Sequence, residues 1–114
     1  MYSFQYFNNL VVISANNVRR ISFLNVSKLH NLVINLFKNP CSTVIIDLEG
    51  VKFIDSRSFL IFMRLNEMAK TKNIRLKFLN LDNEVEELFQ LVDHDNSLKT
   101  CSKEEAEQLL QTVA

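Results

Sequence analysis

Hydrophobic and polar positions follow a strand-like period in some parts of the chain and a helical period in others. Apolar side chains at every second position predict strands at residues 2–6 and 74–78, and residues 10–14 form another strand-like segment. The continuous apolar run at residues 43–48 is typical of a strand buried on both faces. Residues 18–23 fit a short strand less clearly, and residues 98–100 fit a short edge strand.

Four segments have apolar residues on one face of a helix. These helices are predicted at residues 26–38, at residues 56–72, after Asp82, and after the capping box Ser102-x-x-Glu105. Asn25, Asp82 and either Asp55 or Ser56 are the candidate N-caps. Because strands alternate with helices, we predict an α/β fold with a mixed, largely parallel sheet of four to five strands and about four helices.

The composition fits one domain, residues 1–114, and excludes several classes of function. Thirteen basic and thirteen acidic residues give a formal net charge of zero, which argues against a nucleic-acid-binding module. The chain has one glycine, Gly50, whereas phosphate-binding glycine loops need at least two. Since the chain has neither a stretch of ~18 apolar residues nor the pattern of a signal peptide, we expect a cytoplasmic protein without direct membrane insertion.

The residues that carry most catalytic and metal chemistry are scarce. The only histidines, His30 and His94, have no partner at the short spacing of metal ligands. Cys41 and Cys101 are far apart in the sequence, and we expect reduced thiols. Our expectation is therefore a chain that is not an enzyme and binds no metal or cofactor.

The segment Asp55-Ser56-Arg57-Ser58 stands where a strand leads into the second predicted helix. A helix start presents unpaired N–H groups and favours negative charge. The same residues are also explained as ordinary caps and turn formers.

Apolar residues also fall on the polar face of the second predicted helix. Leu60 and Met63 lie on the side of Arg64, and Phe59 lies at its edge. Such groups mark a partner site unless a neighbouring loop covers them. The candidate partner-binding residues are therefore Asp55, Ser56, Arg57, Ser58, Leu60, Met63 and Arg64.

The run Val44-Ile45-Ile46-Asp47-Leu48-Glu49-Gly50-Val51-Lys52-Phe53-Ile54-Asp55-Ser56 resembles the signature of STAS domains. These domains are the anti-sigma factor antagonists of bacteria and the cytoplasmic domains of sulfate-type anion transporters. The resemblance extends through residues 75–80 and 87–89, and Phe23-Leu24-Asn25 is similar to the start of the first helix in transporter-type members. It implies a STAS-like fold and regulation, including transcription regulation, through protein binding without catalysis.

In antagonist members, the resemblance implies a Ser or Thr after the Asp-Ser pair that a histidine-kinase-like partner phosphorylates. Here Arg57 stands at that acceptor position and Ser58 replaces the glycine that follows. We therefore predict a partner-binding domain without the usual phosphoswitch, in which Ser56 and Ser58 are the remaining candidate phosphorylation sites. Two alternatives stay open: a small-ligand or anion sensor that uses Arg57 and the helix start, and a subunit of a membrane-transport complex.

Overall fold

The elements of the protein follow one another in the predicted alternation. The computed structural model describes residues 2–38, 42–93 and 97–113. The elements are β1 (Tyr2–Phe7), β2 (Leu10–Ala15), β3 (Arg20–Ile21), α1 (Val26–Phe37), β4 (Thr43–Asp47), β5 (Phe53–Ile54), α2 (Ser56–Thr71), β6 (Arg75–Leu79), α3 (Asn83–Val92), β7 (Lys99–Cys101) and α4 (Lys103–Val113).

The main sheet has five strands in the order β1-β2-β4-β6-β7. β1 and β2 pair antiparallel, and every other neighbouring pair is parallel. β3 and β5 form a separate parallel pair, in which Arg20 lies opposite Phe53 and Ile21 opposite Ile54. The predicted α/β fold, with a mixed and largely parallel sheet and four helices, is confirmed.

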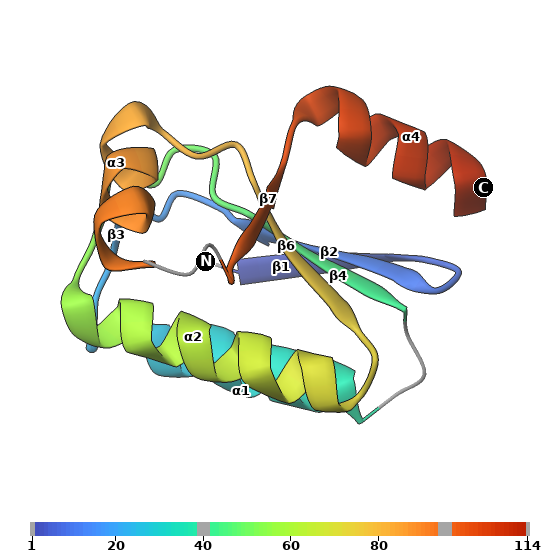
Figure 1. Ribbon diagram of the computed structural model, residues 1–114, viewed down its shortest axis with the longest axis horizontal. Coiled ribbons are helices and arrows are strands. Elements are labelled where there is room, and N and C mark those ends of the chain that lie inside the picture. Colours follow the sequence, from blue (N-terminus) through green and yellow to red (C-terminus); the bar gives the residue numbers. More distant parts are fainter. Residues whose placement is uncertain (1, 39–41, 94–96, 114) are drawn as a thin grey trace.

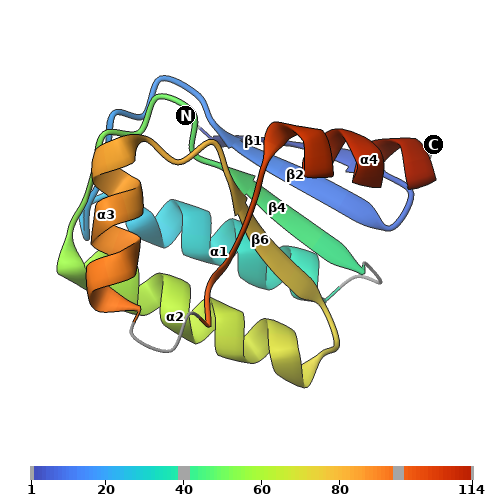
Figure 2. The same ribbon diagram turned by 45° about the horizontal axis from the view of Figure 1, so that its top comes forward.

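Helices cover both faces of the sheet. α1 and α2 lie side by side on one face, whereas α4 lies on the opposite face (Figures 1 and 2). The larger core lies under α1, α2 and α3, and its biggest fully buried side chains are Phe59, Phe62 and Phe78. Phe89 of α3 packs edge-to-face on Phe59, with ring centroids 4.8 Å apart. The sequence-based placement of Phe59 beside the polar face is therefore wrong, because α3 covers this end of α2.

Among the described residues, four of the five positions with positive φ are occupied by asparagine and one by glycine. Asn8, Asn17, Asn73 and Asn80 have φ between 56° and 60°, and Gly50 has φ 86°. Asn is one of the few residues with a side chain that enters this left-handed region at low cost. The predicted turn at Asn8-Asn9 is confirmed, and it joins β1 to β2.

Candidate partner-binding surface

Asp55 connects the start of α2 to the loop before α1. Its Oδ1 accepts a hydrogen bond from the backbone N–H of Ser58 at 2.8 Å, which caps α2. Its Oδ2 accepts a second bond from the backbone N–H of Phe23 at 3.0 Å. Of the two predicted caps, Asp55 and Ser56, the structure selects Asp55. One carboxylate thus holds two segments side by side that are 32 residues apart in sequence.

The surroundings of Asp55 favour its charged form. Partial burial acts against the charge, but the side chain and backbone N–H of Ser58, the backbone N–H of Phe23 and the charge of Arg57 together lower the pKa of Asp55. The Ser58 hydroxyl oxygen itself is buried and has no hydrogen-bond partner, so the backbone N–H of Ser58 is the group that bonds the carboxylate at this helix start. Asp55 is therefore expected to keep its negative charge, and with it the cap, to a lower pH than an ordinary aspartate.

Two arginines lie over exposed aromatic rings next to this junction. The Arg57 guanidinium lies 5.1 Å from the ring centroid of Phe23, and that of Arg20 lies 4.6 Å from the ring of Phe53. Both distances are typical of cation–π contacts. Among the described residues, no carboxylate lies within ion-pair distance of either guanidinium. Each arginine therefore has N–H donors available for a partner.

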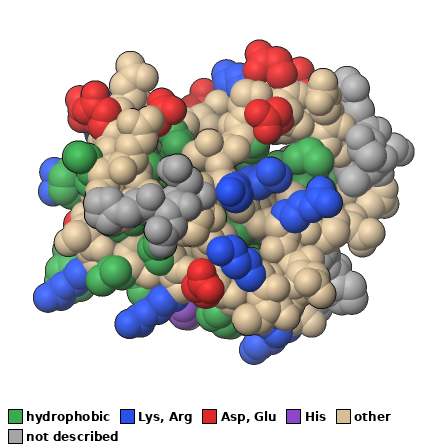
Figure 3. Space-filling view, viewed as in Figure 1, with side chains coloured by type: hydrophobic (Ala, Val, Ile, Leu, Met, Phe, Trp, Pro, Cys, Tyr) green, Lys and Arg blue, Asp and Glu red, His purple; other side chains and the backbone are tan. Residues whose placement is uncertain are grey.

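Exposed aliphatic side chains extend this area. Leu24 follows Phe23 and is 80% exposed, and Leu60, one helical turn after Arg57, is 59% exposed. We call the set the cationic–aromatic surface; it comprises Arg20, Phe23, Leu24, Phe53, Arg57 and Leu60. Basic side chains project where α2 begins, at the lower left of Figure 3, whereas acidic ones gather over α3 and α4.

The site residues predicted from the sequence differ in how far they are exposed in the structure. Ser56, Arg57, Leu60 and Arg64 are exposed, and Asp55 is partly buried as the cap. Met63 is only partly exposed and packs against the large core.

Ser58 points inward and is fully buried. Its hydroxyl is therefore not part of the surface, because the third residue of α2 faces the core. A contact or a phosphate at Ser58 needs local opening of the helix start, so the expectation for this residue does not fit the folded domain.

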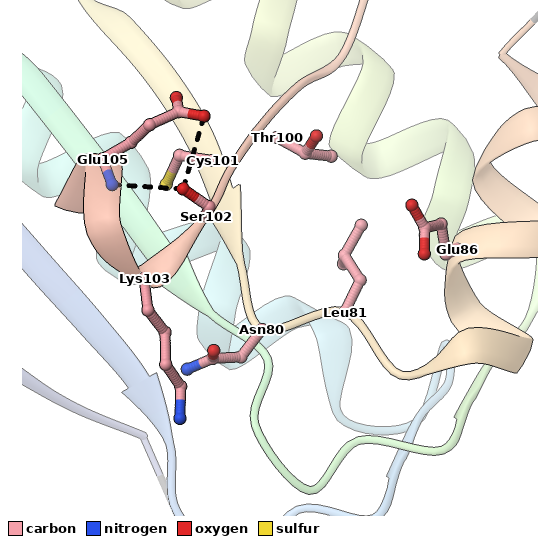
Figure 4. A pocket seen from close by; sticks show the side chains of 8 residues that line it. All are labelled: Asn80, Leu81, Glu86, Thr100, Cys101, Ser102, Lys103 and Glu105. Atoms are coloured by element: carbon pink, nitrogen blue, oxygen red, sulfur yellow. Dashed lines mark hydrogen bonds between the residues drawn. The ribbon is translucent and has the colours of Figure 1, made fainter.

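One alternative to a surface site is a pocket at the carboxyl ends of β6 and β7. It has a volume of about 370 Å³ and lies between α3 and α4 (Figure 4). Its lining residues are Asn80, Leu81, Glu86, Thr100, Cys101, Ser102, Lys103 and Glu105. Since Glu86 and Glu105 offset the single lysine, this pocket gives no support to an anion sensor.

The described part of the chain contains neither a cluster of metal-ligand residues nor a helix that could span a membrane. No group of three potential metal ligands lies together there, and His94 and Cys41 fall outside the described residues. Burial raises the pKa of the Cys101 thiol, which keeps it protonated. None of the described helices has the length and apolar character needed to cross a membrane.

Fold and surface together define a small α/β domain whose candidate site is an open surface. The family model of the STAS domain matches residues 9–107, and the chain belongs to this family. No curated protein matches the chain.

Solved structures share the fold at low sequence identity. An anti-sigma-factor antagonist domain protein from Planctomyces limnophilus has a TM-score of 0.82 at 20% identity, covering 96% of this chain and 97% of that one. Unphosphorylated SpoIIAA, an anti-sigma factor antagonist, has a TM-score of 0.77 at 17% identity, covering 100% and 99%. The murine anion transporter Slc26a9 has a TM-score of 0.76 at 15% identity, covering 95% of this chain and 18% of the transporter.

Sequence reasoning found only part of the cationic–aromatic surface. Arg57 and Leu60 were predicted from the pattern of α2, whereas Arg20 and Phe53 were missed. These two meet because β3 pairs with β5, and two-residue strands leave no periodic signal. Phe23 and Leu24, the remaining members of this surface, could have been suspected from the sequence, because two large apolar residues stand just before the start of a helix.

Proposed function

We propose that this protein is a regulatory protein-binding module of the anti-sigma factor antagonist type, which captures its partner through the cationic–aromatic surface. The observation that carries the proposal is that two arginines lie over exposed phenylalanines and have no carboxylate partner among the described residues. Arginine and aromatic residues are the types that contribute most to protein interfaces. The proposal assigns no catalysis and no cofactor to the chain, and it places the protein in the cytoplasm.

The charges of this surface indicate the chemistry of the partner. A cation–π contact does not use the hydrogen-bond donors of a guanidinium, so these N–H groups can still bind a carboxylate through two parallel hydrogen bonds. Leu24 follows Phe23 in the chain and Leu60 lies one helical turn after Arg57, so these exposed side chains add apolar area to the same surface. We therefore expect a partner segment that combines acidic residues with an apolar anchor.

The phosphoswitch of the antagonist class is absent from this proposal. Arg57 stands at the position of the acceptor and carries a permanent positive charge. Ser58 is buried, which leaves Ser56 as the exposed hydroxyl of the helix start. In this protein, regulation would act through the abundance or the state of the partner rather than through a phosphate on the domain.

The proposal is tested with two surface variants and one matched control. Affinity purification and mass spectrometry identify the proteins captured by the wild type from the source cells. For a purified candidate partner, calorimetry is expected to show at least about tenfold weaker binding for Leu60→Glu and for Arg57→Glu. Leu91→Glu, at a leucine on α3 that is 71% exposed, is expected to bind as the wild type does.

Either of two results would overturn the proposal. Unchanged affinity in both Leu60→Glu and Arg57→Glu would show that the partner binds elsewhere, and equal losses in all three variants would indicate a nonspecific effect of charge. The identity of the partner separates the remaining alternatives: a kinase-like regulator supports the signalling role, whereas a transporter component supports a subunit of a transport complex. Thermal shift with inorganic phosphate and nucleotides tests the anion sensor.

A further inference from the structure

We propose that β1 is a self-association edge, along which two copies of this chain pair antiparallel and join their sheets. β1 is an outer strand of the main sheet, and within the described residues it pairs only with β2. Its other edge therefore offers unpaired backbone N–H and C=O groups. Such an edge is a template for the addition of another strand.

The two edges of the sheet differ in their protection. β7, at the far edge, has three residues and carries Lys99, and both shortness and lysine discourage pairing. β1 has six residues and contains no charged residue, proline or glycine. Phe4 and Tyr6 are 44% and 53% exposed, and their rings contact each other edge-to-face at 5.5 Å. The unprotected edge is thus the long, uncharged and aromatic one.

The hairpin geometry determines which β1 residues offer backbone groups to a second strand. Phe7 lies opposite Leu10 across a two-residue turn, so this pair exchanges the first hydrogen bonds of the hairpin. Because hydrogen-bonded and non-hydrogen-bonded pairs alternate, Ser3 and Gln5 also direct their backbone groups toward β2. The residues between them direct theirs to the open edge.

The outward-directed residues are Tyr2, Phe4 and Tyr6, the aromatic residues of the strand that share one face. They are symmetric about Phe4. A two-fold axis at Phe4 therefore places Phe4 opposite its own copy and Tyr2 opposite Tyr6, and every outward backbone group gains a partner. The aromatic side chains of both copies then meet as cross-strand pairs, which stabilise a sheet.

These features favour a second copy of this chain as the partner that pairs with the open edge of β1. The strand is complementary to itself in backbone register and in side chains, and it presents no charge that would require an oppositely charged partner. The whole chain has a formal net charge of zero, so two copies do not repel each other through their net charge. The pairing leaves β7 and its Lys99 at the two ends of a continuous sheet.

Sedimentation equilibrium of the full chain is the first test. We expect a dimer for the wild type and loss of the dimer for Phe4→Lys, which places two lysines opposite each other, and for Tyr6→Lys, which places a charge on the edge that pairs with the second copy. Leu91→Lys, the matched control on α3, is expected to remain a dimer. A monomeric wild type, or dimers that persist in both β1 variants, would overturn the proposal. Circular dichroism is measured on each variant, so that loss of the dimer is scored only in folded protein.

Cysteine cross-linking tests the register independently of any loss of stability. In a Cys41→Ser background, Phe4→Cys is expected to give a covalent dimer with a short thiol-specific cross-linker, because the two copies of residue 4 face each other. Tyr6→Cys is expected to give none, since its two copies are offset by four residues, or about 13 Å. Cross-linking at residue 6 without cross-linking at residue 4 would overturn the proposed register.

Discussion

The burial of the Ser58 side chain bears directly on whether this residue can be phosphorylated. The residue is fully buried at the third position of α2, and its hydroxyl oxygen has no hydrogen-bond partner. An unsatisfied buried hydroxyl costs stability, because water is lost and nothing replaces it. Its neighbour Ser56 stands exposed at the first position of the same helix. The two serines that looked equivalent in sequence therefore differ completely in access to a kinase.

Substitutions at the two serines test this difference. We expect Ser58→Ala to leave the free energy of unfolding unchanged or to raise it, because an unpaired polar group is removed. Ser58→Glu is expected to lower it by at least about 3 kcal/mol, since a charge is buried without a partner. Ser56→Glu, the exposed control, is expected to change it by less than about 0.5 kcal/mol. Urea denaturation measures all three; a stable Ser58→Glu variant would contradict the burial of this side chain.

Element by element, the starts of the helices show where sequence rules succeed and where they fail. Asp55 and Asp82 cap α2 and α3 as predicted, through the backbone N–H groups of Ser58 and Glu84. Asn25 occupies the predicted cap position of α1, but its side chain makes no cap hydrogen bond. It instead accepts a bond from the N–H of Ser22 and donates one to the carbonyl of Arg20. Residue propensity correctly predicts that Asn25 is the cap position of α1. The path of the preceding loop determines which groups its side chain bonds, namely those of Ser22 and Arg20.

The double role of Asp55 predicts an unequal cost for two similar caps. Asp55→Ala removes a helix cap and the bond to the N–H of Phe23, so we expect a loss of about 2 kcal/mol in the free energy of unfolding. Asp82→Ala removes a cap and an exposed ion pair with Lys52, and its cost is expected to be smaller. Chemical denaturation gives both values. Equal costs would contradict this expectation, because the bond to Phe23 would then contribute no more than the exposed ion pair of Asp82.

At the scale of the whole molecule, periodic patterns predicted the layers but not the surface that they support. The apolar faces of α1 and α2 and the buried run of β4 define the core, because burial imposes a period on the sequence. Arg20 and Phe53 come together through two-residue strands that are joined only in three dimensions. Burial imposes no period on exposed residues, so the pattern of α2 predicts Leu60 as a surface residue but does not predict the contact between Arg20 and Phe53.

Three described aspartates with lowered pKa values link the stability of the whole domain to pH. Asp93 at the end of α3 is buried, which acts against its charge, but bonds from the N–H of Leu98 and the hydroxyl and N–H of Ser97, with the charge of Lys99, lower its pKa. The pKa values of Asp55 and Asp82 are lowered as well. The folded state thus binds fewer protons than the unfolded chain near the ordinary value of 3.8.

Stability is therefore expected to be complete above the ordinary aspartate pKa and to fall as the pH drops through the lowered values. Urea denaturation between about pH 5 and pH 3 should show a declining free energy of unfolding for the wild type. Asp93→Asn should be less stable at neutral pH and should decline less steeply, because one of the three contributing groups no longer titrates. Parallel declines of the two proteins would contradict a contribution of Asp93. A constant wild-type stability would contradict the lowered pKa values of all three carboxylates, since their loss of charge is what weakens the fold in acid.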